Sequence, residues 1–400
     1  MEKVLNVAVC GLGSRGKGHL EYLLKYQKAV NIVGVCDLYE DRRLDGVAMV
    51  KQYRGDEQNP LCVEDYHELL TIPGLDAIIV TTSWEDHIPI TIAAMKAGIR
   101  AGVEVAGAYS LDQLWQLVHA YEETHVPCML LENCCYGREE LMLIRMVREG
   151  LFGELVHMEG GYHHDLREEV TEGRENRHYR LHNYMHRNCE NYPTHELGPI
   201  AQMLNINHGN RMMTLNSVAS CSKGLNAYLK ERHDRNFDLA DYPFAQGDVV
   251  TTIVKCAGGQ TITLALDTNT PKAYSRGLRV QGTKGTYIED NQSLFIEGLN
   301  SDKEPHWREE WGNMDSFREQ YEHPIWKEYL ASDITAGHGG IDHLVFEAFF
   351  DSVRRQVEPP IDVYDMASWM CISVLSEQSI QMGGAPVAIP DFTNGKWMTR

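Results

Sequence analysis

Histidine and tyrosine residues concentrate in one stretch of this chain, between residues 157 and 195. Histidine exchanges protons near neutral pH without assistance, whereas tyrosine, with a reference pKa of about 10, needs a nearby cation to act as a base. Arg180 lies within the stretch, and the rigid step Tyr192-Pro193 leads directly to His195. The pattern predicts general acid/base chemistry. For any one of these side chains, a hydrogen bond inside a loop is an equally good interpretation.

Three histidines of this stretch have a spacing that can imitate a metal site. His178, His182 and His186 are four residues apart, which would place them on one face of a helix. No pattern of Asp, Glu or Cys completes a recognised ligand set around them. We therefore predict that the protein uses no metal ion.

A glycine-rich turn near the N-terminus indicates a second kind of chemistry. The apolar run 5–10 is typical of a strand and breaks into Gly-Leu-Gly-Ser-Arg-Gly, and a helix-like segment and a second strand, 32–36, follow. This order is typical of dinucleotide-binding folds, in which a pyrophosphate lies at a helix N-terminus. The glycines with predicted roles are Gly11 for the tight turn, Gly13 for close approach of the backbone, and Gly16 for packing of the helix.

An acidic residue completes this fingerprint. Asp37 follows the second strand, about 20 residues beyond the glycines, where a carboxylate meets a ribose diol. Because a 2′-phosphate would face that carboxylate, the sequence favours NAD over NADP. Arg42 is close enough in the sequence to keep NADP open as an alternative.

Polar residues also follow the later strands of this region. Trp84 and His87 come after a buried strand, and Glu104 and Glu132 stand at the ends of the next two. Ligands bind at the carboxyl ends of the strands of a parallel sheet, so we expect Trp84 and His87 to flank the cofactor. A helix N-terminus capped by Ser83 explains His87 equally well.

The elements that must position these residues fall into two groups. Strands and helices alternate up to residue 131, which predicts a doubly wound parallel sheet of the Rossmann type. From residue 155 onward the pattern changes to that of a meander and predicts a mainly antiparallel, open sheet. The strands expected there are 249–255, 261–266 and 277–281, and the helices expected to cover one face of that sheet are 140–150, 341–356 and 363–381.

The predicted fold is therefore α/β throughout, in two domains. Residues 1–131 form the NAD-binding Rossmann domain, and residues 132–400 form a substrate-binding α/β domain with the open sheet. Four hundred residues are ample for two such cores. We expect the open sheet to mediate homo-oligomers.

Composition excludes several classes of partner. A formal net charge of −20 argues against nucleic acid and against anionic membrane surfaces, which select clustered Lys and Arg. The ten cysteines lack the spacing that is typical of a disulfide framework or a metal site, so we expect them to be reduced thiols. We see neither a membrane-spanning run nor a signal peptide, so we expect a cytoplasmic enzyme acting on a small molecule.

Several phrases of the chain together resemble one known family. Over essentially its full length the chain is similar to the glucose-fructose oxidoreductase and inositol dehydrogenase superfamily, and within it to glycoside hydrolase family 109, the NAD-dependent α-N-acetylgalactosaminidases. The phrases are Glu104-Val-Ala-Gly-Ala108, Glu132-Asn-Cys-Cys-Tyr136, Gly160-Gly-Tyr-His-His-Asp-Leu-Arg167, Tyr192-Pro-Thr-His195 with Leu197-Gly-Pro199, Tyr274-Ser-Arg276, Val280-Gln-Gly-Thr-Lys-Gly285 and Gly337-His-Gly-Gly340.

The resemblance implies roles for individual residues of this chain. The implied NAD contacts are Ser14, Arg15, Asp37, Trp84, His87, Glu104, Val105, Asn133 and Tyr192. The implied sugar contacts are Tyr162, Arg180, Tyr192, Thr194, His195 and Tyr274, and His164 of the same run is a further candidate for substrate binding. The resemblance also implies that His195 is the partner of the C3 hydroxyl and that Tyr162 and Tyr192 serve as C2 base and leaving-group acid, in either order.

The implied reaction is redox-neutral overall. The sugar is oxidised transiently at C3, loses a proton from C2, eliminates the C1 substituent, adds water at C1 and is reduced again. Ordinary dehydrogenases of the superfamily carry a lysine where this chain has Val105, and an Asp where it has Asn191. The missing lysine argues against a plain dehydrogenase. A sugar C3-dehydrogenase that releases a 3-keto sugar, and a catalytically silent NAD-binding regulator, are the alternatives.

Overall fold

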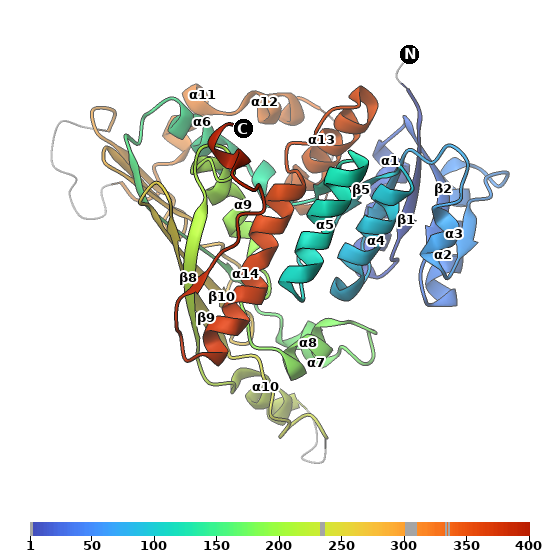
Figure 1. Ribbon diagram of the computed structural model, residues 1–400, viewed down its shortest axis with the longest axis horizontal. Helices are drawn as coiled ribbons and strands as arrows, with labels where there is room; N and C mark the ends of the chain where they lie inside the picture. Colours follow the sequence, from blue (N-terminus) through green and yellow to red (C-terminus); the bar gives the residue numbers. More distant parts are fainter. Residues whose placement is uncertain (1–2, 233–236, 301–309, 333, 335–336) are drawn as a thin grey trace. The chain divides into compact units, whose positions relative to one another are not determined.

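The computed structural model of the protein describes residues 3–232, 237–300, 310–332, 334 and 337–400. These residues form two compact units, whose elements are labelled in Figure 1. Unit 1 comprises Met1–Asn133 and Ser332–Ala367, and unit 2 comprises Cys134–Ala331 and Ser368–Arg400. The boundary at residue 133 lies close to the predicted one. The second segment of unit 1 was not expected from the sequence.

Unit 1 is built on a six-stranded sheet in the order β3-β2-β1-β4-β5-β6, with every described pair of neighbours parallel. This is the strand order of the Rossmann fold, and it confirms the predicted class. The fully buried apolar residues of β1 and β4 explain why both strands lie in the middle. The strands are β1 (Leu5–Cys10), β2 (Val30–Cys36), β3 (Leu61–Val63), β4 (Ala77–Val80), β5 (Arg100–Val103) and β6 (Cys128–Leu130).

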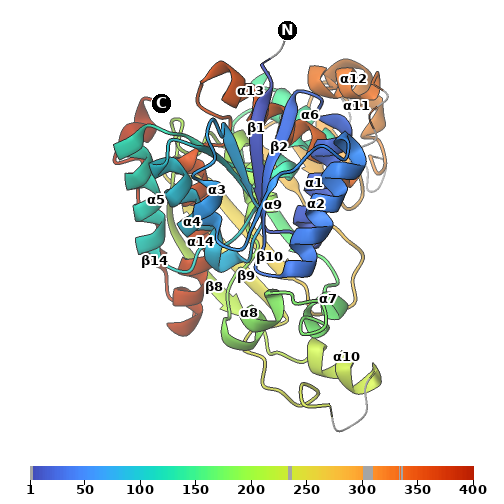
Figure 2. The same cartoon turned by 90° about the vertical axis from the view of Figure 1, so that its right-hand side faces the viewer.

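Helices cover both faces of this sheet. Figure 2 shows α1 and α2 on one side of β1 and β2, with α4 and α5 on the other. This arrangement follows from the strand order, because right-handed crossovers run from β1 to β3 in one direction along the sheet and from β4 to β6 in the other. The helices are α1 (Ser14–Tyr26), α2 (Glu40–Arg54), α3 (Tyr66–Leu69), α4 (Trp84–Lys96) and α5 (Leu111–Thr124).

A helix from the far end of the chain completes unit 1. Helix α13 (Ile341–Arg355) packs on α1, with the rings of Phe346 and Tyr22 stacked at 5.3 Å. Phe349 of α13 lies 3.2 Å from where a Cβ on Gly102 of β5 would be. The sequence placed this helix on the second sheet. The structure corrects that prediction, because the apolar stripe of α13 is buried on the Rossmann domain instead.

Unit 2 is built on an eight-stranded sheet in the order β13-β12-β11-β7-β10-β9-β8-β14. All of its described neighbours are antiparallel except β7 and β10, which are parallel, so the sheet is mainly antiparallel as predicted. The strands are β7 (Leu155–His163), β8 (Met212–Ala219), β9 (Val249–Cys256), β10 (Thr261–Asp267), β11 (Arg279–Gly282), β12 (Gly285–Ile288), β13 (Ser293–Ile296) and β14 (Val387–Ala388).

The order of strands differs from the predicted meander at one place. Strands β9 and β10 pair directly, but β7 lies between β10 and β11. Tyr162 of β7 is opposite Leu266 of β10, and Met158 is opposite Val280 of β11. The reason is a non-local pairing that sequence periodicity does not report. As a consequence, β7 is flanked on both sides and can hold Tyr162 rigidly.

Helices cover one face of this sheet. Figure 1 shows α9 (Thr194–Met203) and α14 (Val363–Gln381) on the same side of β8, β9 and β10. Along β9 the alternate residues Val250, Thr252 and Val254 are buried, whereas Ile253 is exposed. One face is therefore packed and the other is open. The remaining helices of unit 2 are α6 (Arg138–Arg148), α7 (Arg167–Thr171), α8 (Arg180–His186), α10 (Gly224–Arg232), α11 (Asp315–Tyr321) and α12 (Pro324–Leu330).

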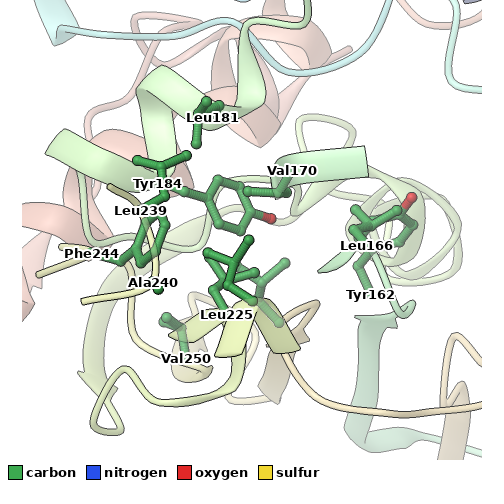
Figure 3. Close-up of a cluster of buried hydrophobic side chains, with 12 residues drawn as sticks. Tyr162, Leu166, Val170, Leu181, Tyr184, Leu225, Leu239, Ala240, Phe244 and Val250 are labelled. Carbon is green, nitrogen blue, oxygen red and sulfur yellow. The ribbon is translucent and has the colours of Figure 1, made fainter. Parts of the chain in front are cut away.

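A cluster of buried apolar side chains supports α7 and α8 against this sheet (Figure 3). Tyr184 of α8 is fully buried in it and shares a hydrogen bond of 2.7 Å with the Thr268 hydroxyl. Tyr162 lies at the edge of the cluster, with its hydroxyl directed away from the other labelled side chains (Figure 3). The ring is thus held by packing while its polar end stays available.

In the described part of the chain, no helix combines the length and apolarity that crossing a membrane requires.

Candidate functional site

The glycine-rich loop begins where β1 ends. Gly11 has a φ of +96°, and a Cβ there would lie 2.5 Å from the backbone of Thr81. A Cβ on Gly16 would lie 1.9 Å from the carbonyl oxygen of Gly11, so α1 can approach the loop only because residue 16 is glycine. A Cβ on Gly13 would instead make an ordinary contact, 3.6 Å from Arg42 Nη1. The space beside Gly13, at the N-terminus of α1, fits a pyrophosphate.

Asp37 is held at the end of β2 by backbone N–H groups. Its Oδ2 accepts from the Leu12 amide at 2.6 Å, and its Oδ1 accepts from the Tyr39 amide at 2.9 Å. A carboxylate oxygen can accept a second hydrogen bond, so both oxygens can still receive ribose hydroxyls. Arg42 Nη1 is 4.0 Å from Oδ2 and its guanidinium stacks on the Tyr39 ring. The residues present therefore fit a dinucleotide with a free 2′-hydroxyl.

Arg15 is at the centre of a partly buried ionic network in unit 1. Its Nε donates to Glu104 Oε1 at 2.8 Å, and its two terminal nitrogens donate to Asp342 at 3.0 and 2.9 Å. Asn133 Nδ2 donates to the same Asp342 at 2.7 Å. Three residues implied as NAD contacts are thus brought together: Asp342 joins Arg15 to Asn133, and Arg15 joins Asp342 to Glu104. Sequence reasoning missed Asp342, which follows the Gly337–Gly340 motif closely but stands 327 residues from Arg15.

Both acids of this network are ionised. Burial alone would raise the pKa of Glu104, but Arg15 and a hydrogen bond from His19 hold it well below its usual value. Burial opposes ionisation of Asp342 in the same way, and His338 and Arg15 lower its pKa. Burial and Arg15 lower the pKa of His19, which is therefore neutral and donates to Glu104 at 2.5 Å. The network is a fixed frame of charges.

Trp84 and His87 stand at the start of α4, where polar residues were expected to flank the cofactor. His87 is only 1% exposed and Trp84 2%. The two ring nitrogens of His87 each lie 3.1 Å from a carbonyl oxygen, that of Ala106 or that of Thr82. Burial lowers the pKa of His87, so the ring is neutral and its one N–H donates to one of these two oxygens. His87 thus holds the loop after β5. Ser83 precedes the helix, but its hydroxyl donates to Asp86 rather than to a backbone amide.

The remaining implied NAD contacts lie around the same loop and helix. Ser14 is exposed at the first position of α1. Val105 is buried, and its amide donates to Glu104 Oε2 at 3.1 Å. The Val105 side chain has no group that exchanges protons. It therefore cannot relay a proton as the lysine that the resemblance implies for ordinary dehydrogenases would. Contact of these residues with the cofactor stays a prediction.

A cluster of tyrosine and histidine rings forms the second candidate site, in unit 2. The Tyr162 ring centroid lies 4.5 Å from that of Tyr192, 5.5 Å from His195 and 6.2 Å from Tyr274. His164 is 5.1 Å from Tyr274, and Tyr192 is 4.7 Å from His195. The tertiary structure therefore brings together five of the residues that the sequence pointed to. They come from the end of β7 and the residue after it, from the segment before β11, and from the entry into α9.

Tyr162 and His164 form a hydrogen-bonded pair in this cluster. The Tyr162 hydroxyl is 2.9 Å from His164 Nδ1. Burial raises the pKa of Tyr162 to about 12, although Arg180 acts in the opposite direction. Burial and then Arg180 lower the pKa of His164. At neutral pH Tyr162 therefore keeps its proton, and the His164 ring is uncharged.

Arg180 supports the cluster from the first position of α8. It is buried, and its Nε is 3.0 Å from Glu169 Oε1. Its guanidinium lies over the Tyr192 ring at 4.9 Å from the centroid, within the range of a cation–π contact. Glu169 also lies 3.7 Å from His178 Nε2. Arg180 therefore places a positive charge beside the two tyrosines for which the sequence predicted it.

The step from Tyr192 to His195 enters helix α9. Pro193 precedes the helix with φ −72°, close to the value that its ring imposes, and this sets the direction of the first turn. A Cβ on Gly160 of β7 would lie 2.7 Å from Cβ of Glu196, so α9 rests directly on the glycine before Gly161 and Tyr162. Thr194 is fully buried, and its implied contact with sugar stays a prediction.

Other histidines of the stretch stand outside this cluster. Helix α8 begins at Arg180, so His178 precedes it and only His182 and His186 share its surface, with ring centroids 4.6 Å apart. His157 belongs to β7 and lies beside Thr261 and Glu159. His178, His182 and His186 therefore do not share a single helix. The prediction that the protein needs no metal stays a prediction.

Both parts of the chain match known protein families. Residues 5–131 match the family described as oxidoreductase family, NAD-binding Rossmann fold, and residues 136–399 match glycosyl hydrolase 109, C-terminal domain. The chain is 38% identical to an alpha-N-acetylgalactosaminidase of Tannerella forsythia, over 99% of this chain and 88% of that protein. It is 36% identical to a glycosyl hydrolase family 109 protein of Parabacteroides distasonis, with the same coverage.

Solved structures show the same fold at lower identity. Scyllo-inositol dehydrogenase from Lactobacillus casei, with bound NAD(H) and scyllo-inositol, has a TM-score of 0.66 and 12% identity. The similarity covers 97% of this chain and 99% of that one. At such identity the likeness concerns the fold.

Proposed function

Because the chain belongs to glycosyl hydrolase family 109, we propose that it is an NAD-dependent glycosidase that cleaves α-N-acetylgalactosaminides or related glycosides through transient oxidation at sugar C3. The observation that carries the proposal is the ring cluster of Tyr162, His164, Tyr192, His195 and Tyr274 in a chain that also has an NAD-binding Rossmann domain. A hydrolase that needed only water and two carboxylates would have no use for that domain.

The residues of unit 1 account for cofactor binding in this proposal. The loop at Gly11–Gly16 would hold the pyrophosphate, and Asp37 the ribose diol. When bound, NAD supplies an acceptor and later a donor for the electron pair of the sugar C3–H bond. The ionic frame of Arg15, Glu104 and Asp342 would keep the loop and α1 fixed while the cofactor turns over.

His195 takes the proton of the C3 hydroxyl in this proposal. Oxidation of an alcohol requires a group that accepts its proton, and Val105 leaves no lysine to do so. His195 lies at the N-terminus of α9, with its ring in edge contact with both Tyr162 and Tyr192. A ketone at C3 then acidifies the C2 proton, which is the step that allows elimination.

The raised pKa of Tyr162 supports a division of roles between the two tyrosines. With a pKa of about 12, Tyr162 keeps its proton at neutral pH and suits the acid that protonates the departing C1 oxygen. Tyr192 then accepts the C2 proton as the C1–O bond breaks, which requires it to act as the phenolate beside the Arg180 guanidinium. Water adds to C1 in the reverse sense, C2 regains a proton from Tyr192, and reduction at C3 restores the sugar. The sequence left these two roles interchangeable.

A panel of α- and β-nitrophenyl glycosides, assayed with and without NAD⁺ in D2O, tests the proposal. We expect aglycone release that depends on NAD⁺, deuterium at C2 of the product, and slower turnover of a substrate deuterated at C3 if C3–H cleavage limits the rate. Retention of every C2 proton would exclude the elimination. Accumulation of NADH with a 3-keto sugar would identify a C3-dehydrogenase, and sugar binding without turnover would identify a silent regulator.

A chelation experiment tests whether metal participates. Activity is expected to survive exhaustive treatment with EDTA, because the proton carriers named above are all side chains of the protein. Loss of activity with EDTA and its recovery with Mn²⁺ or Zn²⁺ would instead require a metal-assisted mechanism.

A further inference from the structure

One buried arginine in unit 2 connects segments that supply different members of the ring cluster. Arg276 Nη2 lies 2.5 Å from Glu140 Oε1, and its Nε lies 3.8 Å from Glu196 Oε1. The Arg276 side chain is 14% exposed, and each carboxylate side chain is 2% exposed. The sequence assigned no role to this triad, although Arg276 belongs to the phrase Tyr274-Ser-Arg276 and Glu196 directly follows His195.

The backbone of the same segment pairs with β7. The Gly161 amide donates to the Arg276 carbonyl at 2.7 Å, and His163 and Ser275 exchange hydrogen bonds of 3.1 and 3.0 Å. Tyr274 is therefore held beside the end of β7, where Tyr162 and His164 stand. The ring distances from Tyr274 to these two residues are 6.2 and 5.1 Å.

The side chain of Arg276 reaches two helix N-termini. Glu140 lies in the first turn of α6, and Glu196 in the first turn of α9, immediately after His195. Carboxylates are stabilised at such positions by the helix dipole. Removing the arginine would leave two buried acids without their cation, which is costly in a protein interior.

We propose that Arg276 is a positioning residue that sets Tyr274 and His195 in register with Tyr162, by binding β7 through its backbone and α9 through Glu196. The inference rests on the proposed function for the roles of these side chains. A guanidinium can bridge two carboxylates because its donors are planar and forked, whereas a lysine ammonium is a point charge. Small displacements of catalytic groups reduce turnover steeply.

Arg276→Met and Arg276→Lys test this proposal against Arg279→Met as a matched control. Arg279 is three residues away on β11, and its ion pair with Glu159 at 3.2 Å is much more exposed. We expect Arg276→Met to lower kcat by about 10- to 100-fold with NAD affinity unchanged, Arg276→Lys to recover part of it, and Arg279→Met to have no effect. Equal kcat in Arg276→Met and the parent would overturn the proposal.

Hydrogen exchange of the backbone provides a readout that does not depend on activity. In Arg276→Met, exchange is expected to accelerate at Gly161, His163 and Ser275 and in the first turn of α9, and to stay unchanged in unit 1. Unchanged exchange at these sites would overturn the proposal even if the parent hydrolyses no glycoside, whereas faster exchange with an inactive parent would remove only the proposed function. If Arg276→Met does not fold, Glu196→Gln is expected to accelerate exchange in α9 alone. Unchanged exchange in α9 of Glu196→Gln would then overturn the proposal.

Discussion

The two candidate sites use opposite kinds of chemistry to hold their residues. In unit 1, Arg15, Glu104 and Asp342 are fixed by charge, with three hydrogen bonds from one guanidinium to two ionised acids. In unit 2, the rings of Tyr162, Tyr192 and His195 pack on one another, and the charged groups lie around them and not between them. A charged frame is suited to binding without changing its protonation, because its acids stay ionised across neutral pH. A cluster of phenol and imidazole rings is suited to moving protons.

The largest effect that tests this contrast is expected at His195. His195→Ala should lower turnover by about 100-fold or more while cofactor affinity stays close to that of the parent, since the proposed function makes His195 the proton acceptor. Steady-state kinetics and NAD titration measure the two quantities. His182→Ala is the control, because His182 is an exposed histidine on α8. A loss of NAD affinity as large as the loss of turnover would assign His195 to binding.

Glu140 tests whether the support of the ring cluster is sensitive to pH. Burial raises its pKa to about 7, with Arg276 acting in the opposite direction. A raised pKa in the folded state stabilises the protein at low pH, and this contribution is lost as the pH rises from about 4.5 to 7, at a cost of up to about 3 kcal/mol. Glu140→Gln should remove this loss. Unfolding free energies of parent and variant at pH 5 and pH 8 measure it, and parallel pH profiles would contradict it.

Asp342 tests the charged frame of unit 1. Asp342→Asn keeps the shape but removes the charge that pairs with Arg15, so we expect a loss of about 2 kcal/mol in stability and weaker NAD binding. Asp351→Asn on the same helix, where the pair with Arg355 is exposed, should cost about 0.5 kcal/mol or less. Because the pKa of Asp342 is lowered, its contribution is present above pH 4 and is lost as the pH falls. Equal losses in the two variants would contradict the prediction.

The smallest expected effect concerns cofactor choice. Asp37→Ala should reduce the preference for NAD over NADP by about tenfold, because it removes the carboxylate proposed to bind the ribose diol and leaves Arg42, whose Nη1 lies 4.0 Å from Asp37 Oδ2, to attract a 2′-phosphate. Binding of both cofactors to parent and variant measures the ratio. Equal affinity of the parent for both cofactors would show that Asp37 does not discriminate.

Much of unit 1 could be predicted because its signals are local. A strand such as Leu5–Cys10 is recognisable from a short apolar run, Gly11 has a φ of +96°, and Gly16 is required by its contact with Gly11 only five residues earlier. The expected helix at 341–356 was also found almost exactly, as Ile341–Arg355. Its partner could not be predicted, since an apolar stripe shows that a helix is buried without showing against what.

The amino-acid sequence by itself determined the dinucleotide fingerprint, the Rossmann class and the concentration of proton-exchanging residues between 157 and 195. Only the tertiary structure decided that β7 lies between β10 and β11, that Asp342 binds Arg15, and that His87 is buried. It also decided that the pKa of Tyr162 is raised, because burial and not the nearby Arg180 dominates it. The physical reason is common to all four: pairing, ion binding and desolvation depend on neighbours far away in the chain, and no spacing within one segment encodes them.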